Sequence, residues 1–153
     1  MENNLERIKN IKLIVEAKEI VFDTETADIL RKKLEHAYFL AAQENSRAVR
    51  IYRFSYRSNG NRVIGFLVEP RIVKEKLPCI VWNRGGSRDF GAITFGNLFG
   101  SMARLAKQGY IVIASNYAGS PGSEGADDFG GENLVDILNL YKILKQCPCA
   151  DVK

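Results

Sequence analysis

Apolar residues recur at helical spacing in two stretches near the start of the chain. The first runs from Leu5 to about Val15 and the second from about Ala27 to Glu44, and this period predicts two helices. Asp23 or Thr24 is suited to cap the second helix, because a short side-chain oxygen can accept a free backbone N–H of the first turn. We therefore expect residues 1–46 to form an N-terminal helical segment.

The apolar period then changes to two, which is typical of strands. Ala48–Arg57 and Arg62–Glu69 are alternating runs, and Asn59 and Gly60 lie between them. Both turn residues tolerate the positive φ of a type I′ turn, so an antiparallel hairpin is predicted. The hairpin opens the second expected unit, residues 47–153.

The stretch Pro78–Glu132 has the pattern of an α/β core. Cys79–Asn83 and Tyr110–Asn116 are short apolar runs of the kind found in strands that helices cover on both faces. A helical pattern lies between them, and a further helix precedes Pro148. A strand, a helix and a strand in this order form a crossover unit. We therefore expect an α/β fold with three layers and a mostly parallel sheet that begins with the hairpin.

Composition and charge narrow the class of protein. The 22 basic and 18 acidic residues leave a net charge of +4, and the basic residues are spread along the chain. Without a block of five or six like charges, nucleic acid is not an expected partner. No apolar run approaches the roughly 20 residues of a membrane span, and no leader pattern is present. A soluble, cytoplasmic protein without a membrane partner is expected, unless a leader was removed.

Neither the cysteines nor the acidic residues match a metal or cofactor motif. Cys147, Pro148 and Cys149 suggest a metal or redox pair, but the usual two-residue spacer is missing, so a structural role is favoured. Cys79 lies in an apolar strand, where a thiol behaves as a small hydrophobe. The acidic residues before the last helix lack calcium-loop spacing, which favours a solvated loop. They are Glu124, Asp127, Asp128 and Glu132. We expect no metal and no cofactor.

Arg84, Gly85 and Gly86 follow the first core strand and are the first chemical candidates. Two glycines let the backbone turn sharply and direct N–H groups into a crevice, as an oxyanion hole requires. A plain turn is the alternative for the glycines, and a surface arginine is the alternative for Arg84. His36, the one histidine, lies far upstream and is a poor candidate for acid–base chemistry.

A series of motifs runs through the second unit. They are Tyr56–Gly60, Ile64–Pro70, Asn83–Gly91, Asn116–Gly125 and Phe129–Gly131, followed by Asp136. In order and spacing these motifs resemble the prolyl oligopeptidase family of serine peptidases. The resemblance covers about residues 47–153. It implies an α/β-hydrolase catalytic domain with the hairpin as its first strands.

The resemblance also implies roles for single residues. Arg84 stands where relatives often carry tyrosine or histidine, which leaves the backbone N–H groups near Gly85 and Gly86 as oxyanion donors. Ala118 replaces an arginine that is common in relatives. Asp136 matches a structural helix position rather than the acid of a catalytic triad.

In this family a segment like Ala150–Lys153 leads into the strand before the Gly-x-Ser-x-Gly nucleophile elbow, and the triad follows from there. The chain is therefore expected to be the N-terminal part of a serine peptidase, inactive alone, whose complete form takes a peptide or a small ester. A fragment of an esterase is one alternative. A non-catalytic binding or assembly protein, which self-associates through an exposed sheet edge, is the other.

Overall fold

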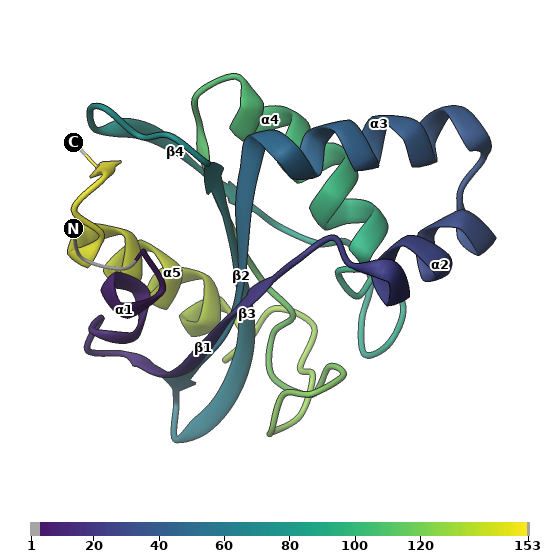
Figure 1. Ribbon diagram of the computed structural model, residues 1–153. Helices are drawn as coiled ribbons and strands as arrows, with labels where there is room; N and C mark the ends of the chain where they lie inside the picture. The colour runs from purple at the N-terminus through teal and green to yellow at the C-terminus, as the bar shows by residue number, and fades with distance from the viewer. Residues whose placement is uncertain (1–3, 153) are drawn as a thin grey trace.

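The computed structural model describes residues 4–152, which form a six-stranded sheet with helices on both faces (Figure 1). The strand order across the sheet is β1-β2-β3-β5-β4-β6. The strands are β1 (Ile14–Ile20), β2 (Val49–Ser58), β3 (Asn61–Pro70), β4 (Leu77–Trp82), β5 (Ile111–Ser115) and β6 (Ala150–Asp151).

The helices divide between the two faces and give the expected three layers (Figure 1). One apolar core lies under α1 and α5, and the other lies under α2, α3 and α4. The helical segments are α1 (Asn4–Lys9), α2 (Thr24–Lys33), α3 (His36–Ala48), the π-helix η1 (Asn97–Met102), α4 (Ala103–Lys107) and α5 (Leu134–Gln146). No helix in this part of the chain is long and apolar enough to cross a membrane.

The sheet is mixed, which corrects the expectation of a mostly parallel one. β4 pairs in parallel with β5 and β6, whereas β1–β2, β2–β3 and β3–β5 are antiparallel pairs. The hairpin accounts for the difference, because β3 runs against β5, with Gly65 opposite Ser115. A crossover helix makes its own two strands parallel but does not set the direction of the strands that join the sheet beside them.

The predicted hairpin is confirmed. β2 and β3 pair from Val49 opposite Pro70 to Ser58 opposite Asn61. Asn59 and Gly60 have φ values of 45° and 78°, as the type I′ turn requires.

The N-terminal segment contains a strand that the helical pattern did not predict. The expected first helix ends at Lys9, and β1 follows as an edge strand on β2. The second helical stretch forms two helices, α2 and α3. The extended residues Leu34 and Glu35 separate them. The Asp23 cap is confirmed, since its carboxylate accepts the Thr26 N–H at 2.8 Å. The division of the chain at residue 47 stays a prediction, although the sheet crosses it.

Candidate functional site

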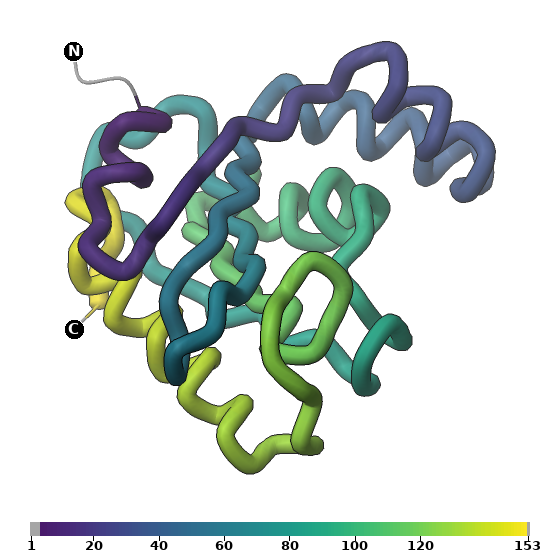
Figure 2. Tube along the Cα trace, turned by 90° about the horizontal axis from the view of Figure 1, so that it is seen from below, coloured from purple at the N-terminus to yellow at the C-terminus, as the bar shows by residue number. Residues whose placement is uncertain are grey.

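Two loops meet at the carboxyl ends of β4 and β5. These strands are parallel, with Trp82 opposite Ala114, so the loops that follow them leave the sheet at the same edge. They are residues 83–94 and residues 116–133, and Figure 2 shows them on one side of the molecule in teal and green. The motifs Asn83–Gly91 and Asn116–Gly125, which lie in these loops, are therefore at the same edge of the sheet.

Arg84 joins the two loops from inside. Its Nε donates to the Asn116 carbonyl at 3.2 Å, its Nη1 donates to the Phe90 carbonyl at 2.7 Å, and its Nη2 donates to the Ser120 hydroxyl. The guanidinium also stacks 5.2 Å from the centre of the Tyr117 ring. Arg84 is only 7% exposed, so the alternative of a surface arginine is wrong. The side chain fixes the loops and is not directed at solvent.

Two further hydrogen bonds connect the loops through backbone N–H groups. Asn116 Oδ1 accepts the Ile93 N–H at 3.0 Å, and Asp127 Oδ2 accepts the Arg88 N–H at 2.7 Å. The Phe129 and Arg88 N–H groups lower the pKa of Asp127, because they stabilise its charged form. The loops are thus connected at several places along their length.

Most acidic residues of the second loop accept hydrogen bonds from backbone N–H groups. Asp128 accepts N–H groups of Gly131, Glu132 and Asn133 at the approach to α5. Within residues 4–152, no group of three or more acidic, cysteine or histidine side chains is arranged to hold a metal ion. These carboxylates shape the loop.

Gly85 and Gly86 line an open cavity of about 610 Å³ between β4 and the start of η1. Both glycines are exposed, and in the described part of the chain their N–H groups bond to no other group. Gly91 closes this loop with a φ of 77°, and a Cβ there would lie 1.9 Å from the Gly85 carbonyl oxygen. A side chain at position 91 would displace the backbone that presents these two N–H groups.

A buried polar group supports the second loop from below. Asp136 is 2% exposed, and its Oδ2 accepts the Ala118 N–H at 2.8 Å. Tyr56 Oη lies 2.8 Å from Ser115 Oγ and 3.1 Å from the Asp136 carbonyl oxygen. Burial raises the pKa of Tyr56, so the phenol stays protonated. This contact is what a structural role of Asp136 requires.

Tyr117 is a residue that the sequence pattern did not single out. It follows β5 with a φ of 62°, a conformation that costs a bulky residue energy and that clusters at functional sites. Its hydroxyl lies 3.4 Å from Asn83 Oδ1, at the other loop. Burial raises the pKa of the Tyr117 phenol. Only the glycine-rich surroundings signalled an unusual backbone here.

The described loops present two unbonded backbone N–H groups to an open cavity, but they contain no nucleophile bonded to a base. His36 is exposed at the start of α3, and no hydrogen bond in the described residues joins it to a serine or cysteine. Ser115 and Ser120 bond to Tyr56 and Arg84 instead. The described residues therefore offer hydrogen-bond donors to a ligand but no activated nucleophile.

Replacing Arg84 with methionine is expected to destabilise the 153-residue chain by about 2–4 kcal/mol, since three acceptors, in two buried hydrogen bonds and one part-buried one, lose a charged donor. The apolar stem remains, so the change reports the hydrogen bonds. Urea unfolding measures it. Arg104→Met, at an exposed position of α4, is the control and should change stability by less than about 0.5 kcal/mol. Equal losses in both variants would contradict a joining role for Arg84.

Comparison with known proteins finds sequence relatives and similar solved structures. No family model matches the chain. It is 36% identical over 103 residues to the uncharacterized peptidase YtmA of Bacillus subtilis. The matched segment covers 67% of this chain and 38% of that protein. It is also 31% identical over 99 residues to dipeptidyl-peptidase 5 of Porphyromonas gingivalis. This matched segment covers 60% of this chain and 14% of that protein. The crystal structure of acetyl xylan esterase 1 from a Thermoanaerobacterium species matches with a TM-score of 0.54 at 16% identity, over 96% of this chain and 44% of that one.

This chain spans less than half the length of each of these proteins. The sequence matches relate it to peptidases, and the structural match shows an α/β-hydrolase fold with a mixed sheet. These matches therefore relate the chain to hydrolases.

Proposed function

We propose that this chain is the oxyanion-side part of a serine hydrolase, and that the complete protein is a peptidase of the prolyl oligopeptidase type. The nucleophile, its base and the acid that orients the base lie outside these 153 residues. The isolated chain is then inactive, because bound donors do not replace an activated nucleophile.

The observation that carries this proposal is the pair of unused N–H groups at Gly85 and Gly86. They lie in an open cavity at the carboxyl end of β4, where α/β enzymes bind their ligands. Arg84 and Asp127 hold the loop from behind, so the donors need no reorganisation when charge develops on a carbonyl oxygen. The sequence relation to two peptidases supports peptide hydrolysis as the reaction.

A fluorophosphonate probe, which labels activated serines, tests the proposal. We expect covalent labelling of the full-length protein encoded by the open reading frame that contains this chain, and no labelling of the 153-residue chain. The labelled serine should lie in a Gly-x-Ser-x-Gly motif. Labelling of the isolated chain, or a full-length protein that stays unlabelled, would contradict the proposal.

An esterase is the second candidate, favoured by the structural match to acetyl xylan esterase 1. Both reactions use the same oxyanion geometry, so the described loops do not separate them. The ratio of kcat/KM for a peptide anilide to kcat/KM for a nitrophenyl ester, measured on the full-length protein, separates the two candidates. Because a nitrophenyl ester is the more reactive substrate for a peptidase as well, ester hydrolysis without detectable cleavage of the anilide would favour the esterase.

A further inference from the structure

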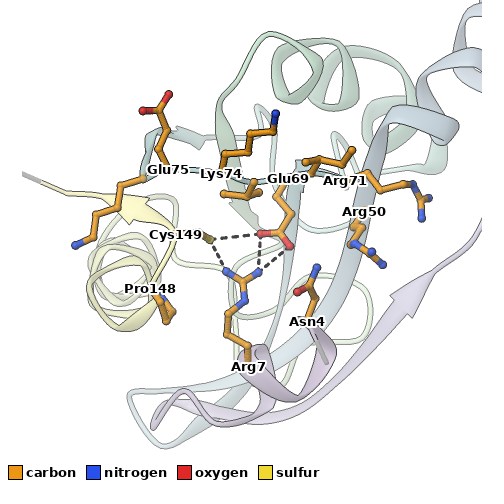
Figure 3. A pocket seen from close by; sticks show the side chains of 12 residues that line it. Asn4, Arg7, Arg50, Glu69, Arg71, Lys74, Glu75, Pro148 and Cys149 are labelled. Carbon is orange, nitrogen blue, oxygen red and sulfur yellow. Dashed lines mark hydrogen bonds and ion pairs between the residues drawn. The ribbon is translucent and has the colours of Figure 1, made fainter. Parts of the chain in front are cut away.

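A cluster of two thiols and one ion pair lies away from the two loops. Arg7 comes from α1, Glu69 from the end of β3, and Cys147 and Cys149 from the turn between α5 and β6. Figure 3 shows the Arg7 guanidinium directed at both Glu69 and Cys149, beside an open cavity of about 820 Å³. The proposed function uses none of these residues.

The turn holds the two sulfur atoms side by side. Cys147 Sγ and Cys149 Sγ are 3.3 Å apart, and the Ala150 N–H bonds to the Cys147 carbonyl at 3.0 Å to close a four-residue turn. Pro148 fixes φ at the second turn position. The Cys147 N–H bonds to Leu144 in α5, and the Cys149 carbonyl accepts the Leu77 N–H of β4. Both cysteine backbones are therefore anchored with their thiols adjacent.

Arg7 places a positive charge against both sulfur atoms. Its Nη1 donates to Cys149 Sγ and lies 3.4 Å from Cys147 Sγ, while Nη2 bonds to both Glu69 oxygens at 2.7 Å. Cys149 Sγ also lies 3.6 Å from Glu69 Oε2. The other charged residues that line the cavity are mostly basic. They are Arg50, Arg71, Lys74, Glu75 and Lys76.

The two thiols differ in how readily they lose a proton. The hydrogen bond from Cys149 lowers the pKa of Cys147 against the effect of burial, and Arg7 lowers it further. The same hydrogen bond, followed by burial, raises the pKa of Cys149. The pair thus loses one proton easily and keeps the second, and the remaining proton lies between the two sulfur atoms.

We propose that Cys147 and Cys149 form a dithiol that hydroperoxides oxidise reversibly to a disulfide. Cys149 lines the cavity, and Cys147 is buried behind it. As the Cys149 sulfur attacks one peroxide oxygen, its proton passes to the neighbouring Cys147 sulfur, and the O–O bond breaks to leave a sulfenic acid on Cys149 and hydroxide. The Cys147 sulfur then attacks the Cys149 sulfur, displaces the hydroxyl group of the sulfenic acid and forms the S–S bond. Two electrons pass from sulfur to the peroxide, and with hydrogen peroxide both thiol protons end in two water molecules.

A metal site and a permanent structural disulfide both fit this cluster less well. The Arg7 guanidinium contacts both the thiols and Glu69, where its charge would repel a cation. A disulfide across a single residue closes too short a loop to add much stability by chain entropy, and strained disulfides are the readily reduced ones. Reversible oxidation suits this geometry.

The test is oxidation of the folded chain with one equivalent of hydrogen peroxide, followed by N-ethylmaleimide and peptide mapping by mass spectrometry. We expect a disulfide between Cys147 and Cys149, two hydrogens lighter than the dithiol, that dithiothreitol reverses. Cys79 should remain a thiol, because burial raises its pKa to about 11. A disulfide to Cys79, a disulfide between two chains, or sulfinic acid without an internal disulfide would overturn the proposal.

Two rate comparisons test whether the folded site is responsible. Disulfide formation should be at least about tenfold faster in the native chain than in the chain unfolded in urea, as for a thiolate stabilised by a neighbouring cation. Arg7→Gln should slow it by about tenfold, and Lys74→Gln, an exposed residue of the same cavity, should leave it unchanged. A native rate no higher than the unfolded rate would overturn the proposal, and so would a folded Arg7→Gln variant with the wild-type rate. If Arg7→Gln does not fold, the native and unfolded rates of the wild type decide.

Discussion

Replacing Glu69 with alanine is expected to destabilise the chain by about 3–5 kcal/mol, the cost of removing one partner from a buried ion pair. The Glu69 side chain is 1% exposed and that of Arg7 is 14% exposed. Arg7 keeps its charge in the variant, and it then lies in a buried site without the carboxylate that balances it. Tyr52, whose hydroxyl lies 3.3 Å from Glu69 Oε1, also loses its partner.

Urea unfolding followed by circular dichroism measures this effect. Glu75→Ala is the matched control, because Glu75 lines the same cavity but is exposed, and its change should stay within about 0.5 kcal/mol. The double variant Arg7→Met with Glu69→Leu should be more stable than the sum of the single changes predicts, since it leaves no unpaired charge. A loss below about 1 kcal/mol for Glu69→Ala would instead place this pair among exposed ion pairs.

The central elements could be predicted from the sequence because their signals are local. Asn59 and Gly60 specify a turn with two positive φ values, and the hairpin follows in the expected register. The Asp23 carboxylate caps α2 by accepting the N–H of Thr26, only three residues further along the chain. In each case the interacting groups are close in sequence, so the pattern contains the structural information.

β1 was missed because its structure comes from a distant partner. Val15 continued the helical spacing of the first stretch, yet it is 49% exposed on an edge strand. The hydrogen bonds that make Ile14–Ile20 a strand come from β2, which lies more than thirty residues away. An edge strand with one open face has few apolar positions that would signal it.

The break within the second helical stretch was missed for a similar reason. Leu34 and Glu35 are extended, which resets the helical phase between α2 and α3. Phe39 and Ala42 are therefore buried, and Ala37 is exposed. A single period of 3.6 residues read over the whole stretch gives no sign of this break.

The two loops that follow β4 and β5 could be predicted from the sequence to lie together, but the contacts of their side chains could not. Arg84 bonds to residues 6 to 36 positions away, and their distances become short only in the folded loops. The Arg7 cluster spans up to 142 residues of sequence, so Cys147 and Cys149 carried the only local signal for it. Buried polar contacts between distant segments depend on tertiary structure.

Replacing Gly85 with proline is expected to lower kcat of the proposed full-length hydrolase by about 10²–10³-fold, the effect of losing one oxyanion donor. Proline lacks the N–H that would donate to the developing oxyanion, and the Gly85 N–H bonds to no other group in the described residues. The substitution therefore removes a donor to the transition state without breaking a hydrogen bond of the resting loop. KM should change little, because the interaction is made mainly in the transition state.

Gly85→Ala is the matched control for this variant. A Cβ at Gly85 would meet nothing within 4 Å, and its φ lies outside the left-handed region, so alanine keeps both the backbone and the N–H. We expect its kcat to stay within about twofold of wild type, in contrast to the 10²–10³-fold loss. Thermal melting of both variants separates a catalytic loss from unfolding. If proline and alanine at this position reduced kcat equally in folded proteins, the Gly85 N–H would not be an oxyanion donor, and the donors would have to come from Gly86 or from a side chain such as Tyr117.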